Sequence, residues 1–278
     1  MIEIAKILVP TDFSESSRKA LDYALALAEP QKSEILLLHV VPPIAYAYDT
    51  GMVAANIAEL EAGARDSAGR HVRELQAQAI GDKAPSRTMV RDGAPFVEIV
   101  RVARSHRCES MLLGLSHIER ETVESRLDWL MSTVASDVVV LRAPARFQLA
   151  NARRVLVPVG GRRDQSFLRA RLLGSLSRSG ERTITFLRVL PTGTPPQRFV
   201  RAQREMQVLA RDEAPGAHDV VVVQAEDMTS ELARRAGEHD LLVLGMQRES
   251  RRRKFLGDLA VQLAQATDCP LLLISRRG

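Results

Sequence analysis

Short apolar runs alternate with stretches of helical periodicity along the whole chain. In the first half, strand-like runs lie near residues 5–10, 34–41, 87–91, 110–114 and 137–142. The clearest helix is expected over Ser14–Glu29, because Ser14 suits an N-cap, apolar residues recur at helical spacing, and Pro30 stops the helix. Strands that are apolar on both faces and separated by helices predict a parallel sheet with helices on both sides.

This pattern occurs twice. Lys6–Pro10 recurs as Arg154–Pro158, and Ile35–Pro42 recurs as Ile184–Pro191. A repeat of this kind predicts two copies of one structural unit. The predicted fold class is therefore α/β, with two tandem doubly wound five-stranded parallel sheets in domains spanning residues 1–146 and 152–278, joined near residues 147–153.

Composition narrows the class of protein. Hydrophobic residues make up 45% and charged residues 26% of the 278 residues, which excludes a disordered chain. No apolar run approaches the ~20 residues of a membrane span, and the first residues do not resemble a secretory signal, so no membrane contact and a cytoplasmic location are expected. Cys108 and Cys269 have no metal-binding or disulfide spacing and are expected to be small packed residues.

Charge differs between the halves. Residues 1–150 hold 17 Lys and Arg against 20 Asp and Glu, a net charge of −3, whereas residues 151–278 hold 22 against 14, a net charge of +8. The basic half suggests contact with phosphates or nucleic acid. Because aromatic residues make up only 4% of the chain, few side chains are available to stack on bases, and nucleic acid is not an expected partner.

The ends of the chain resemble a known family. Ile7–Glu15 is similar to the opening of a universal stress protein (UspA-like) domain, and the segments Gly257–Leu263 and Asp268–Ile274 are similar to its closing helix and strand. The resemblance covers nearly the whole chain as a tandem protein. It implies the adenine nucleotide alpha hydrolase-like fold, with strand order 3-2-1-4-5 in each half.

The resemblance also implies a ligand site. Some family members bind ATP through an Asp after the first strand and a Gly-x2-Gly-x9-Gly-Ser/Thr loop after the fourth, where backbone N–H groups can surround phosphates. If a ligand binds, it is expected to be ATP or another adenine nucleotide with Mg. The corresponding positions of this chain are Pro10, Thr11, Asp12, Val40, Gly114 and Ser125 in the first half, and Gly245, Arg248, Gly257 and Asp258 in the second.

Both halves depart from the ATP-binding pattern. In the first, His117 replaces the second glycine, Glu124 precedes Ser125 where a glycine is expected, and further acidic residues in the loop repel phosphate. In the second, Gly160 stands in place of the Asp, Arg248 replaces a glycine, and Asp258 replaces the hydroxyl residue. The structural alternatives are that Asp12 only closes a turn beside Ser14, that Gly257 serves helix packing, and that residues 248–254 form a solvated basic loop.

The last strand of each half lies at a sheet edge in the implied order. Residues 138–141 and 271–274 are apolar, and an apolar edge must be paired or covered. We therefore expect the two halves to form an internal pseudo-dimer, with a further homodimer of the whole chain as an additional expectation. Trp129 and Met131, expected at the start of the first half's last helix, are interpreted as core or domain-contact residues.

Three functions follow from these observations. The first interpretation is a non-enzymatic stress-response module with degenerate nucleotide sites, which acts on an unknown protein partner. The alternative is an ATP-binding sensor that uses Asp12 and Gly114 of the first half. A weak ATPase is a third hypothesis, but no metal-binding carboxylate pair, P-loop or complete nucleophile elbow is evident in the sequence, so an enzyme is not expected.

Overall fold

The computed structural model describes eight segments of the chain. These are residues 5–43, 54–116, 121–144, 146–160, 166–178, 181–214, 216–246 and 258–275. Within these segments no helix is long and apolar enough to cross a membrane.

The first half forms the predicted five-stranded parallel sheet. Its strands are β1 (Lys6–Pro10), β2 (Glu34–Val41), β3 (Ser86–Asp92), β4 (Ser110–Leu115) and β5 (Asp137–Arg142). Its helices are α1 (Glu15–Ala28), α2 (Ala54–Leu75), α3 (Pro95–Ser105) and α4 (Glu121–Thr133). The strands lie in the order β3-β2-β1-β4-β5, which confirms the expected topology.

The second half repeats this arrangement. Its strands are β6 (Arg154–Pro158), β7 (Thr183–Pro191), β8 (His218–Ala225), β9 (Leu241–Met246) and β10 (Leu271–Ser275). Its helices are α5 (Ser166–Arg178), α6 (Pro196–Glu213), α7 (Met228–Ala236) and α8 (Asp258–Ala266). The order β10-β9-β6-β7-β8 is the first half's order read in reverse, so the two copies share one topology.

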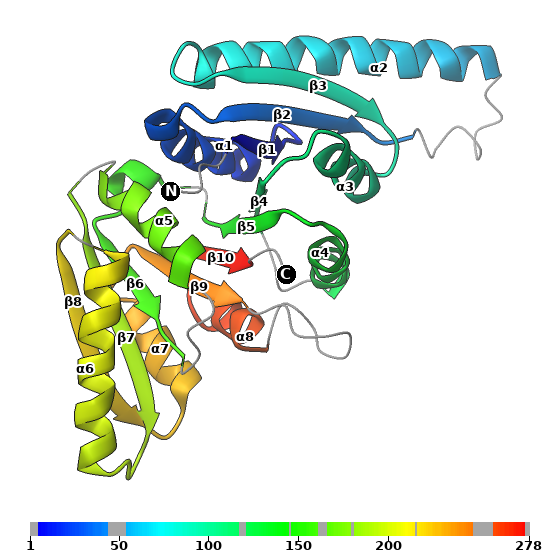
Figure 1. Ribbon diagram of the computed structural model, residues 1–278. Helices are drawn as coiled ribbons and strands as arrows, with labels where there is room; N and C mark the ends of the chain where they lie inside the picture. Colours follow the sequence, from blue (N-terminus) through cyan, green and yellow to red (C-terminus); the bar gives the residue numbers. More distant parts are fainter. Residues whose placement is uncertain are drawn as a thin grey trace.

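The two last strands join the halves into one sheet. Strand β10 pairs antiparallel with β5, with Leu272 opposite Leu141 and Leu273 opposite Val140. Figure 1 shows the resulting ten-stranded sheet, which runs from β3 through the β5/β10 seam to β8. The expected internal pseudo-dimer is therefore confirmed, and the apolar edges of both halves are paired within the chain.

Helices cover both faces of the sheet across the seam. On one face, buried residues of α1, α2, α5 and α6 belong to one continuous hydrophobic cluster. On the other face, a second cluster joins α3, α4, α7 and α8. Because each cluster contains residues from both halves, the halves share their hydrophobic cores and do not merely touch at the edge strands.

Helix α1 begins as the sequence predicts. The Ser14 hydroxyl accepts a hydrogen bond from the Ser17 backbone N–H at 3.2 Å, which satisfies one of the free donors of the first turn. Buried residues of the helix, including Leu21 and Tyr23, belong to the hydrophobic cluster on this face of the sheet. The capped first turn places Thr11–Ser14 at the carboxyl end of β1.

A buried arginine fastens the seam. The Arg142 side chain, at the end of β5, is only 7% exposed and crosses to the second half. Its guanidinium donates to the Ala264 carbonyl, to the Thr267 carbonyl at 2.8 Å and to the Cys269 carbonyl at 3.2 Å. These carbonyls lie at and just beyond the end of α8, where free acceptors and the helix dipole favour a cation. Arg142 therefore acts as a C-terminal cap supplied by the other half.

Four side chains test the remaining packing predictions. Cys108 and Cys269 are buried, as expected for small packed residues. Met131 is fully buried, as expected for a core residue, but Trp129 is 43% exposed, so of its two interpretations, core or domain-contact residue, the core position is wrong. Both residues lie near the end of α4 and not at its start. Positions two apart on a helix point about 200° apart around the axis, so only one of them can face the sheet.

Candidate functional site

The strand order brings the predicted site residues of the first half together. Strand β1 pairs with β4 on one side and with β2 on the other, so the strand order reverses between β1 and β4. In doubly wound sheets ligands bind at this reversal, beyond the carboxyl ends of the strands. The turn after β1, with Thr11 and Asp12, and the end of β4, with Gly114, meet at this point.

The side chains of the β1–α1 turn bond to the turn itself. The Thr11 hydroxyl accepts a hydrogen bond from the Phe13 backbone N–H at 3.0 Å and lies 3.1 Å from the Ser17 hydroxyl. One oxygen of Asp12, Oδ1, accepts from the Ser14 N–H at 3.0 Å and from the Ser14 hydroxyl at 2.5 Å. Both residues therefore support the turn that starts α1, as the structural alternative for Asp12 requires.

The Asp12 carboxylate stays charged near neutral pH. Partial burial raises the pKa of Asp12, but the hydrogen bonds that its carboxylate accepts from the Ser14 hydroxyl and backbone N–H oppose this effect and hold the pKa below its ordinary value. Its side chain is exposed, and Oδ2 has no hydrogen bond among the described residues. One carboxylate oxygen is thus left for a ligand at the strand end.

Gly114 is required by packing alone. A Cβ placed on Gly114 would lie 1.9 Å from the Ser16 carbonyl oxygen and 2.8 Å from the Ser17 nitrogen, both in the first turn of α1. Carbon atoms essentially never approach backbone atoms this closely. The glycine therefore lets α1 lie directly against β4, whether or not a ligand binds.

An aromatic cluster that the sequence analysis did not identify stands beside this turn. Phe13 has a φ of 64°, a strained value for a residue with a side chain, and its ring stacks on the His39 ring at 4.4 Å. His71 of α2 meets the same phenyl ring edge-on at 5.6 Å. His39 donates from Nδ1 to the Thr11 carbonyl at 2.8 Å, which ties β2 to the turn. Val40, next in the strand, is 8% exposed.

The phosphate side of the site is only partly described. Ser125 lies in α4 and Asp258 is the first residue of α8, but the positions of their side chains lie outside the described parts of the structure. Arg248 and Gly257 lie outside the described residues altogether. Gly245 is placed in β9, paired with Ile274 of β10.

The second half repeats the backbone of the turn without its polar side chains. The Val159 N–H donates to the Leu187 carbonyl at 2.8 Å, as Thr11 donates to Leu38 at 2.7 Å. Valine thus replaces the hydroxyl residue, and Gly160 replaces Asp12. A Cβ placed on Gly160 meets no atom within 4 Å in the described structure, so none of the described residues requires a glycine there. The second turn therefore lacks both the hydroxyl and the carboxylate of the first.

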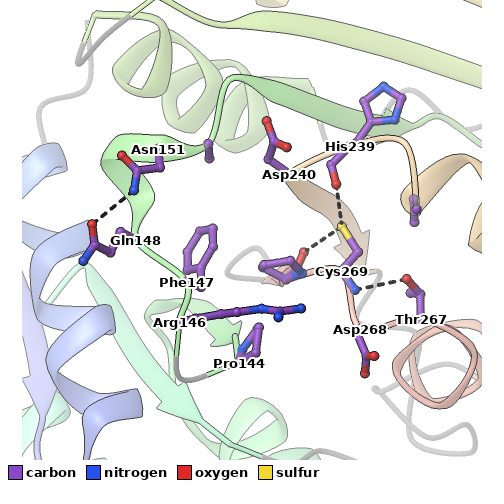
Figure 2. A pocket seen from close by; sticks show the side chains of 14 residues that line it. Pro144, Arg146, Phe147, Gln148, Asn151, His239, Asp240, Thr267, Asp268 and Cys269 are labelled. Carbon is purple, nitrogen blue, oxygen red and sulfur yellow. Dashed lines mark hydrogen bonds between the residues drawn. The ribbon is translucent and has the colours of Figure 1, made fainter.

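A separate cavity of about 420 Å³ lies at the junction of the halves. Figure 2 shows the linker residues Pro144 to Asn151 facing the loop Thr267 to Cys269 across it. Burial raises the pKa of the Cys269 thiol to about 12, so the thiol is protonated at neutral pH. The thiol donates to the His239 carbonyl, while the His239 Nδ1 donates to the Arg235 carbonyl at 2.7 Å and the ring points away. This cavity has no activated nucleophile.

Catalytic and metal chemistry have little support in the described residues. Burial raises the pKa of Cys108 to about 11, so this thiol is also unreactive. No group of three or more His, Cys, Asp or Glu side chains that could hold a metal ion is found in the described segments. Among the described residues, the strand-end site offers hydrogen-bonding groups and the Asp12 carboxylate.

Comparison with known proteins gives one family. The sequence profile of the universal stress protein family matches residues 3–144. No curated protein sequence matches the chain. A universal stress protein from Archaeoglobus fulgidus DSM 4304 aligns over 100% of both chains with 16% identity and a TM-score of 0.69.

Two further structures share the full-length fold. A functionally unknown protein from Pseudomonas aeruginosa PAO1 aligns over 99% of this chain and 93% of its own, with 12% identity and a TM-score of 0.64. The cytoplasmic domain of a prokaryotic cation chloride cotransporter aligns over 98% and 96%, with 11% identity and a TM-score of 0.58. At these identities the likeness concerns the fold. The profile match over the first half, together with the repeated five-strand order in the two halves, shows that this chain belongs to the universal stress protein family and has the tandem form of its fold.

Proposed function

We propose that this tandem universal stress protein is a cytoplasmic, non-enzymatic regulatory module of the stress response, whose strand-end sites have lost ATP binding. The observation that carries the proposal is the contact between Gly114 and the first turn of α1. Gly114, Thr11 and Asp12 all have a role in the fold, so their presence is explained without a nucleotide.

In the first half, the positions that would serve only a phosphate group are the ones that have changed, because His117 and Glu124 stand where glycines are expected. The second half has instead lost the carboxylate, which Gly160 replaces. In the first half, the glycine needed for packing is retained, whereas the two glycines expected only for backbone contact with phosphate are absent. This division is the pattern expected when a fold is kept and its ligand is lost.

The proposal directs attention to the protein's outer surfaces. Strands β5 and β10 pair with each other, so neither is open to a partner. The outermost strands of the sheet are β3 and β8, one from each half. A homodimer of the whole chain, or a regulatory partner, would therefore use these edges or the helical faces.

The second candidate function is nucleotide sensing by the first half. It is favoured by the exposed, charged Asp12, whose Oδ2 has no hydrogen bond in the described structure. A carboxylate at this strand end can accept hydrogen bonds from ribose hydroxyl groups. In this alternative, Asp12, Val40 and Gly114 bind a nucleoside, and the second half binds none because it has Gly160 in place of the carboxylate.

Titration of the full chain with ATP and magnesium separates the two functions. The informative variant is Asp12→Asn, because an amide oxygen still accepts the Ser14 hydrogen bonds while the negative charge is removed. Asp66→Ala, on the exposed surface of α2, is the matched control. The regulatory proposal predicts no binding in any of the three proteins. Saturable binding that the Asp12→Asn variant loses and the Asp66→Ala variant keeps would establish the sensor instead.

A further inference from the structure

The basic second half contains a groove that the strand-end site does not explain. The groove has a volume of about 630 Å³ and lies between the end of β7 and the first turns of α6. Figure 1 shows α6 lying along β7 and β8, away from the seam between the halves. The reversal of strand order lies between β6 and β9, so this groove is one strand away from the switch point.

Three arginines line the groove with a single carboxylate. Arg188 comes from β7, Arg198 and Arg201 come from α6, and Glu205 lies one turn further along the helix. The Glu205 carboxylate accepts from Arg188 Nη1 at 3.1 Å and from Arg201 Nε at 2.8 Å. The groove therefore has an excess of two positive charges.

Most of the donors of these arginines remain available to a ligand. A guanidinium carries five N–H donors, and the contacts with Glu205 use one from Arg188 and one from Arg201. The Arg198 side chain has no hydrogen bond or ion pair among the described residues. Arginine donors converging on a concave surface are the arrangement that proteins use to bind phosphate groups.

Arg188 occupies an unusual position for a cation. It follows the buried Leu187 in a strand covered by α6, and its side chain is only 22% exposed. Arg188 is the counterpart of His39 in the repeat. Pro10 lies opposite Leu38, and its equivalent Pro158 lies opposite Leu187, so the next residues, His39 and Arg188, are also equivalent. In the first half that histidine stacks on an aromatic ring, whereas here the same position carries a permanent positive charge.

The loop that closes the groove is held in place before any ligand arrives. The Gly193 N–H donates to the Gln224 side-chain oxygen at 3.0 Å, and the Gln224 amide donates to the Thr194 carbonyl at 3.3 Å. The Thr194 hydroxyl donates to the Pro191 carbonyl at 2.6 Å. A wall fixed in this way lowers the ordering cost of binding.

We propose that the groove formed by Arg188, Arg198 and Arg201 is an anion site of the second half, which binds a small phosphate-bearing molecule. Its volume lies within the ~300–1,000 Å³ range of small-molecule pockets, which favours a compact ligand over an acidic protein segment. The proposal goes beyond the regulatory function above and gives part of the second half's net charge of +8 a role.

Calorimetric titration of the full chain with inorganic tripolyphosphate, without magnesium and at about 0.15 M salt, where distant surface charges are screened, tests the site. One binding event per chain is expected. Arg198→Ala should weaken binding about tenfold or more, because it removes a charge-assisted donor. Arg204→Ala, an exposed arginine of the same helix that does not line the groove, should stay within about twofold of the unchanged protein, as expected for weak, screened surface electrostatics. Glu205→Gln should strengthen binding, since it removes the carboxylate that competes for Arg188 and Arg201.

Three results would overturn the proposal. The first is the absence of tripolyphosphate binding to the unchanged protein. The second is an equal loss in the Arg198→Ala and Arg204→Ala variants, which would indicate general charge attraction. The third is competition by a hexaglutamate peptide at lower concentrations than tripolyphosphate, which would assign the groove to an acidic protein segment.

Discussion

Replacing Gly114 by alanine should destabilise the protein severely. The added methyl group would lie 1.9 Å from the Ser16 carbonyl oxygen, where real contacts are at least 3.0 Å, so α1 and β4 must separate by about 1.1 Å. Both groups in contact are anchored in regular structure, so neither can move by a change of rotamer. Overpacking of cores costs about 1–3 kcal/mol, and a backbone clash belongs at the upper end, about 3 kcal/mol.

Thermal unfolding followed by circular dichroism would measure this effect. Unfolding entropy near 60 °C is about 2.1 cal/mol/K per residue, or about 0.6 kcal/mol/K for 278 residues, so a loss of about 3 kcal/mol lowers Tm by about 5 °C. Gly63→Ala in α2 is the matched control, since its Cβ would meet no atom within 4 Å in the described structure. That variant should gain about 0.5–1 kcal/mol from helix propensity. A Gly114→Ala protein as stable as the unchanged chain would refute the packing explanation.

Three further predictions concern the seam, the second half and the thiols. Arg142→Met should lower the free energy of unfolding in urea by about 3 kcal/mol, because the buried carbonyls at the end of α8 lose the guanidinium donor. An unchanged urea midpoint would contradict the capping role of Arg142. Arg169 and Glu213 form a buried bidentate ion pair at 2.6 and 2.7 Å, so Arg169→Met alone should lower the free energy of unfolding by about 3–5 kcal/mol, and adding Glu213→Leu should restore most of that stability. If the single and the double variant lose the same stability in urea unfolding, this expectation is wrong. Burial raises the pKa values of Cys108 and Cys269 from 9.0 to about 11 and about 12, so above about pH 9 the unfolded chain releases protons that the native protein keeps, and the free energy of unfolding should fall between about pH 9 and 11. A free energy of unfolding that rises over this range in urea titrations would contradict the burial of the thiols.

Much of the fold could be predicted because it depends on short-range patterns. The apolar runs gave the strands of the first half almost to the residue, and Ser14 marked the start of α1 correctly. The repeated Lys6–Pro10 and Arg154–Pro158 segments indicated the tandem arrangement, and the apolar last strands indicated the seam. Each of these features is determined by residues that are close together in the sequence.

The features that the sequence analysis missed depend on contacts between distant residues. Gly114 matched a ligand motif, but its steric requirement arises from Ser16, almost a hundred positions earlier. Arg142 looked like an ordinary strand end until β10 brought the end of α8 beside it. Trp129 is apolar but 43% exposed, since Met131, two positions later in α4, takes the buried side of the helix.

The candidate site was predicted in its location and only partly in its chemistry. The strand order placed the turn after β1 beside the end of β4, as expected from the doubly wound topology. The strained Phe13 and its stack on His39 could not be predicted, because a positive φ at a bulky residue has no reliable sequence signal. His39, a polar residue within the apolar run of β2, was the available indication of this aromatic cluster.

Mass spectrometry of the small molecules released by denaturing the purified chain would show whether the first half retains a nucleotide site. If ATP binding has been lost, no adenine nucleotide is recovered in stoichiometric amount from the unchanged protein. An adenine nucleotide recovered at close to one per chain, and absent from the Asp12→Asn variant purified in parallel, would contradict this loss. That result would mean that Asp12 and Gly114 hold a working nucleotide site in the first half of the protein.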